Sequence, residues 1–138
     1  MTPASEGGGA RLLARDVLLR DGATLRLQAP VPSDFGDVKA FYDGLSPESR
    51  YLRFHGYGRT DFAARAAVEA AGMDRFALIA RHDGAVVAVA GFDGLREPGV
   101  AEVSFAVADD LQRHGIGTRM LEQLAAIGAE RGIHRFDA

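Results

Sequence analysis

Two periodicities meet between residues 100 and 132, and the rest of the chain is arranged around them. Up to residue 107, apolar and polar positions alternate, which predicts a strand with two different faces. The apolar positions of this strand are Val103, Phe105 and Val107. After Asp109 and Asp110, apolar residues recur at helical spacing and predict a long amphipathic helix. Its apolar stripe is Ile116, Met120, Leu124 and Ile127.

Earlier segments predict two hairpins. Residues 17–20 and 24–28 flank an Asp-Gly turn, with Leu25 and Leu27 facing inward. Residues 75–81 and 85–92 flank a second Asp-Gly turn, and their nearly continuous apolar runs are typical of strands covered on both faces. Gly91 marks a close approach or a bulge in the second hairpin, and a further strand begins after Gly132.

Capping residues and helical spacing predict three helices between the hairpins. Ser33 is expected to cap the first, and Ser46 caps the second, with Pro47 at its first position. Thr60 is expected to cap the third helix, over residues 61–71.

The turn before the long helix has the chemistry of an anion site. The first turn of a helix has unpaired N–H groups and the positive end of the helix dipole. Gly115 and Gly117 have no Cβ, so a phosphate group can come close to these N–H groups. The pattern predicts a diphosphate cradle at the end of a strand, and a branched side chain at either glycine should weaken anion binding more than folding.

Two common phosphate-binding motifs do not fit this turn. A Walker loop ends in Gly-Lys-Ser/Thr, but Lys39 is the one lysine of the chain and lies far from the turn. A dinucleotide fingerprint has a third glycine or alanine where Met120 stands.

A Gln/Arg-x-x-Gly-x-Gly/Ala signature does fit, as Gln112-x-x-Gly115-x-Gly117, five residues beyond Val107. Strand, spacing and helix together resemble the coenzyme A site of the GNAT superfamily of N-acetyltransferases. The resemblance implies that acetyl-CoA is the cosubstrate and that these residues bind it: Phe105, Val107, Gln112, Arg113, His114, Gly115, Ile116, Gly117 and Thr118.

The implied contacts differ along this segment. The main chains of Phe105 and Val107 would pair with the pantetheine amides while their side chains lie in the core. The N–H of Val107 would polarise the thioester carbonyl if the paired part of the strand ends there. Arg113 stands where the family often has glycine, and it either adds charge at the diphosphate or is solvated. His114 is expected to contact phosphate or water rather than to act as an acid.

The resemblance also implies the fold class. GNAT-like domains are α+β, with a mixed, mostly antiparallel central sheet flanked by helices. The similarity covers residues 16–138 and ends at the family's fifth strand, so we expect the C-terminal part of the fold to be absent and the chain to be a fragment. Residues 1–15 read as a disordered tail. The open sheet edge would favour homo-oligomers.

A second, shorter similarity concerns the acceptor. Residues 45–56, LSPESRYLRFHG, resemble a segment of GNAT domains joined to acyl-CoA synthetase (ADP-forming) type domains, which act on protein lysines. In that branch a glutamate in an Ala-Glu-Val setting is the general base, and Glu102 matches it. A protein partner such as an acyl-CoA synthetase follows from this similarity. The alternative is that Glu102 is a solvated or ion-paired strand carboxylate.

The composition of the chain excludes several classes of function. The 138 residues carry 16 basic and 19 acidic side chains in an intermixed order, and no basic stripe indicates nucleic acid. There is no cysteine, which excludes a thiolate nucleophile and thiolate metal ligands. His55, His82 and His134 are dispersed, and no metal is expected. No apolar run approaches the length of a membrane span or a signal peptide, so a cytoplasmic location is expected.

Three functions remain open at this point. The first is an acetyl-CoA-dependent N-acetyltransferase acting by direct attack on a protein lysine, with Glu102 as the base. The second is a regulatory module that senses acetyl-CoA without turnover. The third is an acetyltransferase of small-molecule amines.

Overall fold

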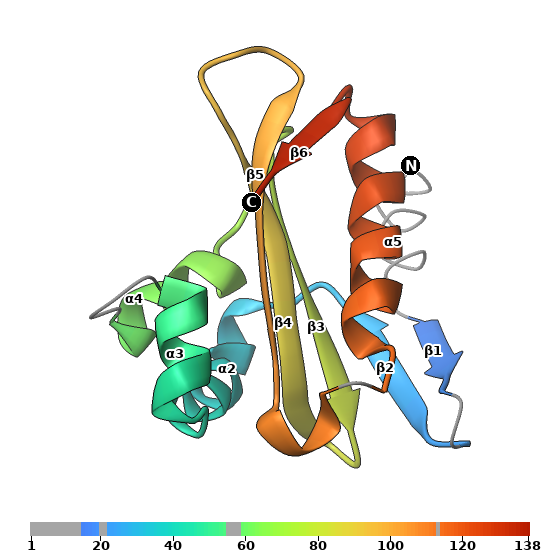
Figure 1. Ribbon diagram of the computed structural model, residues 1–138. Helices are drawn as coiled ribbons and strands as arrows, with labels where there is room; N and C mark the ends of the chain where they lie inside the picture. The colour runs from blue at the N-terminus through green and yellow to red at the C-terminus, as the bar shows by residue number, and fades with distance from the viewer. Residues whose placement is uncertain (1–14, 20–21, 55–58, 113) are drawn as a thin grey trace.

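A six-stranded sheet forms the centre of the molecule, with helices on both faces (Figure 1). The computed structural model describes residues 15–19, 22–54, 59–112 and 114–138. The strands are β1 (Arg15–Leu18), β2 (Thr24–Gln28), β3 (Arg75–His82), β4 (Ala85–Gly94), β5 (Val100–Val107) and β6 (Arg135–Asp137). They lie in chain order, and each pair is antiparallel except β5 and β6, which are parallel. The α+β class and the mostly antiparallel sheet are confirmed.

The helices divide between the two faces of the sheet. The long helix α5 (Ile116–Glu130) covers one face, and α2 (Phe35–Asp43), α3 (Pro47–Phe54) and α4 (Thr60–Val68) lie on the other (Figure 1). Two short 3-10 turns, Pro32–Asp34 and Asp109–Leu111, precede α2 and α5. The predicted tail lies outside the described residues up to residue 14, as do Arg20 and Asp21, and β1 begins at Arg15.

The central hairpin β3–β4 is covered on both faces, as its continuous apolar runs predict. Leu78 packs into the cluster under α5, and its neighbour Ile79 packs into the cluster under α2 and α4. At the turn, Asp83 and Gly84 both have positive φ angles, of 51° and 85°, which the tight hairpin requires. Gly91 is a close approach, because a Cβ there would lie 2.6 Å from the carbonyl oxygen of Phe76.

Two predicted helix starts are wrong. Ser33 does not cap the first helix. Instead the 3-10 turn intervenes, and the Asp34 carboxylate accepts the N–H of Val31 at 2.8 Å. Thr60 is the first residue of α4 rather than its cap, because its hydroxyl donates to the Asp43 carboxylate at 2.6 Å. That helix also ends at Val68, before the predicted residue 71.

The pairing of β5 changes along its length. β6 pairs only with Val100–Glu102 of β5, through Arg135, Phe136 and Asp137. Within the described part of the chain, the stretch 103–107 has β4 on one side and no strand on the other. This unpaired stretch, the free edge of β5, positions the candidate site.

Candidate functional site

The glycine turn opens α5 without a side-chain cap. Gly115 is the N-cap residue, with a left-handed φ of 84°, and among the described residues no side-chain cap hydrogen bond reaches the start of the helix. Nothing lies within 4 Å of the position that a Cβ on Gly115 would occupy. These N–H groups are therefore open to water or to an anion, as the cradle prediction requires.

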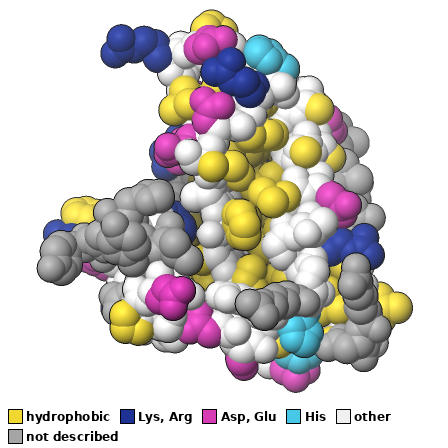
Figure 2. Space-filling model, viewed as in Figure 1, with side chains coloured by type: hydrophobic (Ala, Val, Ile, Leu, Met, Phe, Trp, Pro, Cys, Tyr) yellow, Lys and Arg dark blue, Asp and Glu magenta, His cyan; other side chains and the backbone are white. Residues whose placement is uncertain are grey.

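A groove of about 540 Å³ runs from this turn along the free edge of β5, and we call it the turn groove. Its lining includes Ser49, Arg53, Phe105, Val107, Gln112, Gly115, Gly117 and Thr118. Figure 2 shows hydrophobic side chains in a strip over β5, between the helices on the left and α5 on the right. The walls come from α3, β5 and the start of α5, and α3 is distant in the sequence from the other two.

The main chain of Val107 faces the turn groove. The N–H of Ala108 donates to the carbonyl of Val87 on β4 at 2.8 Å. Successive residues of an antiparallel strand present their N–H and C=O groups to opposite sides. The N–H and C=O groups of Val107, and those of Phe105 two residues earlier, therefore point to the free edge, where a pantetheine arm could pair with them.

The side chain of Phe105 does not lie in the core, contrary to the prediction, whereas that of Val107 does. Phe105 is 44% exposed and lines the turn groove. Its ring stands over Gly117, where a Cβ would lie 3.1 Å from Cε2 of the ring. Within the described residues, no strand lies beyond the free edge to add side chains over this ring.

The side chains of the remaining predicted cofactor residues point in different directions. Thr118 is exposed in the groove wall, and Ile116 is buried in the core under α5. The Gln112 side chain turns inward, with Nε2 donating to the Val107 carbonyl at 3.2 Å. His114 is half-buried just before the glycines, and Arg113 lies outside the described residues.

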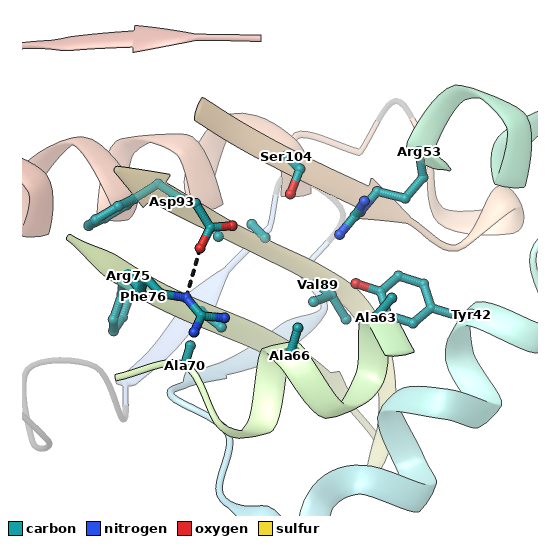
Figure 3. A pocket seen from close by; sticks show the side chains of 15 residues that line it. Tyr42, Arg53, Ala63, Ala66, Ala70, Arg75, Phe76, Val89, Asp93 and Ser104 are labelled. Carbon is teal, nitrogen blue, oxygen red and sulfur yellow. Dashed lines mark hydrogen bonds and ion pairs between the residues drawn. The ribbon is translucent and has the colours of Figure 1, made fainter. Parts of the chain in front are cut away.

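A second, smaller cavity of about 60 Å³ lies on the opposite face of the sheet, and we call it the α4 cavity. Figure 3 shows alanine side chains of α4 forming one wall, with Ser104 of β5 across from them. Tyr42 and Arg53 approach each other at one end, and Arg53 lines the turn groove as well. Burial raises the pKa of the Tyr42 phenol, while the nearby Arg53 acts in the opposite direction, so the hydroxyl keeps its proton at neutral pH.

Glu102 lies on the same strand face as Ser104, two residues away, and is exposed. Its cross-strand neighbours are Asp93 of β4 and Asp137 of β6. Asp93 lines the α4 cavity and binds Arg75 at 2.9 Å, the pair marked in Figure 3. Glu102 therefore stands beside the end of the α4 cavity and is exposed to solvent.

A polar cluster joins the N-terminus of α3 to the turn after β5. The Asp109 carboxylate accepts the hydroxyl of Ser49 at 2.6 Å and the N–H of Ser46 at 3.0 Å. These hydrogen bonds hold the pKa of Asp109 below its usual 3.8, and the bond from Ser49 has the largest effect. The predicted Ser46 cap is confirmed, since its Oγ accepts the N–H of Ser49 at 3.1 Å.

Replacing Asp109 by asparagine should destabilise the protein in a pH-dependent way. Because the pKa is lowered in the folded state, the carboxylate stabilises the fold fully above about pH 4, and this contribution is lost as the pH falls through the lowered pKa. The difference in unfolding free energy between wild type and Asp109→Asn, measured by urea denaturation, should be largest at pH 7 and shrink towards pH 3. Asp110→Asn, a matched surface change, should show no such trend. An equal difference at both pH values would contradict the assignment.

Two features are absent from the described residues. No group of three or more histidine, aspartate or glutamate side chains among them could hold a metal ion. None of their helices combines the length and the apolar character needed to cross a membrane.

Comparisons with known proteins agree with this geometry. The family model described as Acetyltransferase (GNAT) family matches residues 38–138. The crystal structure of the GNAT domain of S. lividans PAT is 32% identical, with a TM-score of 0.81 over 88% of this chain and 75% of that one. A cAMP-binding acyltransferase from Mycobacterium smegmatis is 26% identical, with a TM-score of 0.57 over 97% of this chain and 43% of that one.

A third structure supports the fold alone. The ribosomal-protein-alanine N-acetyltransferase from Brucella melitensis is 21% identical, with a TM-score of 0.59 over 82% of this chain and 77% of that one. A search of curated protein sequences gives no significant match. The family match over most of the chain and the similarity to the S. lividans domain agree with the strand, turn and helix of the site, and the chain belongs to the GNAT family of acetyltransferases.

Proposed function

We propose that this chain transfers an acetyl group from acetyl-CoA to an amine, and that the acceptor is a lysine side chain of a protein. The observation that carries the proposal is the uncapped glycine turn at the head of a groove whose floor is the free edge of β5. Membership of the GNAT family supports acetyl transfer in general. The donor site, the acceptor and the base are the specific parts of the proposal.

The turn groove fits the donor in both charge and shape. The uncapped N–H groups at the start of α5, next to Gly115 and Gly117, suit the diphosphate. The N–H and C=O groups of Phe105 and the C=O of Val107, at the free edge, suit the two pantetheine amides. The thioester would then lie where the groove meets Arg53 of α3.

The α4 cavity is the matching place for the acceptor. It lies across β5 from the turn groove, and Arg53 lines both. Its wall of alanine methyl groups suits an unbranched alkyl chain such as the stem of lysine. The similarity to the PAT domain from S. lividans also favours a protein acceptor, and an acyl-CoA synthetase is the partner that the sequence resemblance suggests.

The reaction needs a neutral amine, a polarised carbonyl and a leaving group. A lysine amine has a pKa of about 10.4, so a nearby base increases the reactive fraction at neutral pH. Glu102, beside the end of the α4 cavity, accepts the proton through water as the C–N bond forms. The N–H of Val107 stabilises the oxyanion, and the C–S bond then breaks to release the thiolate of coenzyme A, which takes up a proton.

Thiol release from acetyl-CoA tests the proposal and separates the alternatives. The protein should release coenzyme A in the presence of lysine-containing protein acceptors, such as acyl-CoA synthetases, and mass spectrometry should locate the acetyl group on a lysine. Release with small amines only would favour a small-molecule acetyltransferase. Tight binding of acetyl-CoA without release for any amine would favour the sensing module.

A further inference from the structure

The polar cluster between α3 and the glycine turn has a consequence for how the two binding regions are linked. Asp109 lies in the 3-10 turn that leads into α5, and its two hydrogen-bond donors on the other side, Ser46 and Ser49, are 63 and 60 residues away in sequence. One carboxylate therefore fastens the first turn of α3 to the segment that carries the cradle. The lowered pKa of Asp109 agrees with a charged acceptor at this joint.

Gln112 closes the cluster on the cradle side. Its Nε2 lies within hydrogen-bond distance of three acceptors: Val107 O at 3.2 Å, Ser49 Oγ at 3.3 Å and Asp109 Oδ1 at 3.4 Å. The Ser49 hydroxyl gives its proton to Asp109 and offers its lone pairs to Gln112. The amide of Gln112 is thus committed to holding α3, the end of β5 and the turn together, rather than to contacting phosphate.

The far end of α3 reaches the second binding region. Ser49, in the first turn, lines the turn groove, and Arg53, one helical turn later, lines both the turn groove and the α4 cavity. The strand against which α3 packs is β5. A shift of α3 relative to the cradle would therefore move Arg53 in both regions at once.

We propose that Asp109 is a positioning residue that couples α3 to the cofactor cradle, so that a ligand in the turn groove also orders α3 and sets Arg53 at the acceptor cavity. The donor then prepares the acceptor site before the acceptor arrives. This inference rests on the proposed function only in taking coenzyme A as the ligand of the turn groove. Coupling of this kind is a free energy shared between two sites. Removing the hydrogen bonds of Asp109 should abolish the coupling while both sites can still bind their ligands.

Hydrogen exchange with and without coenzyme A tests the coupling directly. In the wild-type protein, coenzyme A should slow amide exchange in both the start of α5 and α3. In Asp109→Ala, it should still slow exchange at the start of α5, while the slowing in α3 should fall by roughly tenfold, the effect of losing hydrogen bonds to a charged group. Because both segments are read in one protein, a general loss of stability would not produce this split.

Two further variants make the test specific. Asp110→Ala changes the same charge one residue away, at an exposed side chain that takes part in no hydrogen bond or ion pair within the described residues, and should retain slowing in both segments. Ser49→Ala keeps the Ser46–Asp109 bond and should reproduce the split in weaker form, which also serves if Asp109→Ala fails to fold.

The remaining outcomes separate the two proposals. Slowing in both segments of Asp109→Ala, or slowing only at the start of α5 in wild type, would overturn the coupling and leave the proposed donor site in place. If coenzyme A slowed exchange in neither segment of the wild-type protein, the donor site would be overturned, and the coupling with it.

Discussion

Replacing Glu102 by glutamine should lower the rate of acetyl transfer by about a hundredfold or more, the usual contribution of a general base. Glutamine has nearly the same shape but cannot accept the proton that the attacking amine must lose. The affinity for acetyl-CoA should not change, because Glu102 does not line the turn groove. Steady-state kinetics would give the rate, and calorimetric titration would give the dissociation constant.

Asp137→Asn is a suitable control for this variant. Asp137 is the cross-strand neighbour of Glu102 on β6, and its carboxylate is paired with Arg135 at 3.2 Å. This change removes the same charge beside Glu102 on the neighbouring strand, so a purely electrostatic effect on the acceptor would appear in both variants. If Glu102→Gln retained full turnover at pH 7, Glu102 would be a solvated strand carboxylate and the base would have to be sought elsewhere.

Replacing Gly117 by valine should weaken coenzyme A binding by at least about tenfold, or 1.4 kcal/mol. Even the Cβ alone would lie 3.1 Å from the Phe105 ring, so the ring must move within the groove. The added methyl groups would also stand at the first N–H groups of α5. Folding should largely be retained, because the neighbour that must give way is an exposed side chain rather than backbone. Calorimetric titration with coenzyme A measures the affinity, and thermal unfolding checks the fold.

Gly36→Val is the matched control for Gly117→Val. Gly115→Val is less suitable as a second test of the cradle. Gly36 lies in the first turn of α2, away from the groove, with open space around it, so the same substitution tests the general cost of valine for glycine in a helix. Gly115 has a φ of 84°, a conformation that strains any side chain. Gly115→Val should therefore destabilise the fold as well as the anion site, unlike the sequence-based expectation. Unchanged affinity in a folded Gly117→Val protein would mean that the cradle lies elsewhere.

The parts of the structure that the sequence predicted depend on local signals. The Asp83-Gly84 turn needs two positive φ angles, and those residue types adopt them most readily. The β5–turn–α5 unit also lies within one continuous segment, where a change of period marks the strand end and the glycines mark the turn. Such signals need no knowledge of what packs against them.

The parts that were missed depend on contacts between distant segments. Tyr42 has the spacing of a core residue in α2, and nothing near it in sequence shows that Arg53 and Ser104 share a cavity with it. The bond between Asp109 and Ser49 likewise spans 60 residues. Thr60 has the residue type and position of a helix cap. In the folded structure Asp43 lies beside it and accepts its hydroxyl instead.

The free edge of β5 has a consequence for sequence divergence within this fold. Contacts made by N–H and C=O groups are available to nearly every residue type, since proline alone lacks the N–H. Substitutions at Phe105 or Val107 can therefore change side chains while the groups offered to a bound arm stay in place. A binding surface built in this way tolerates drift that would destroy a surface built from side chains. This tolerance directs any search for relatives towards the glycine turn rather than the strand.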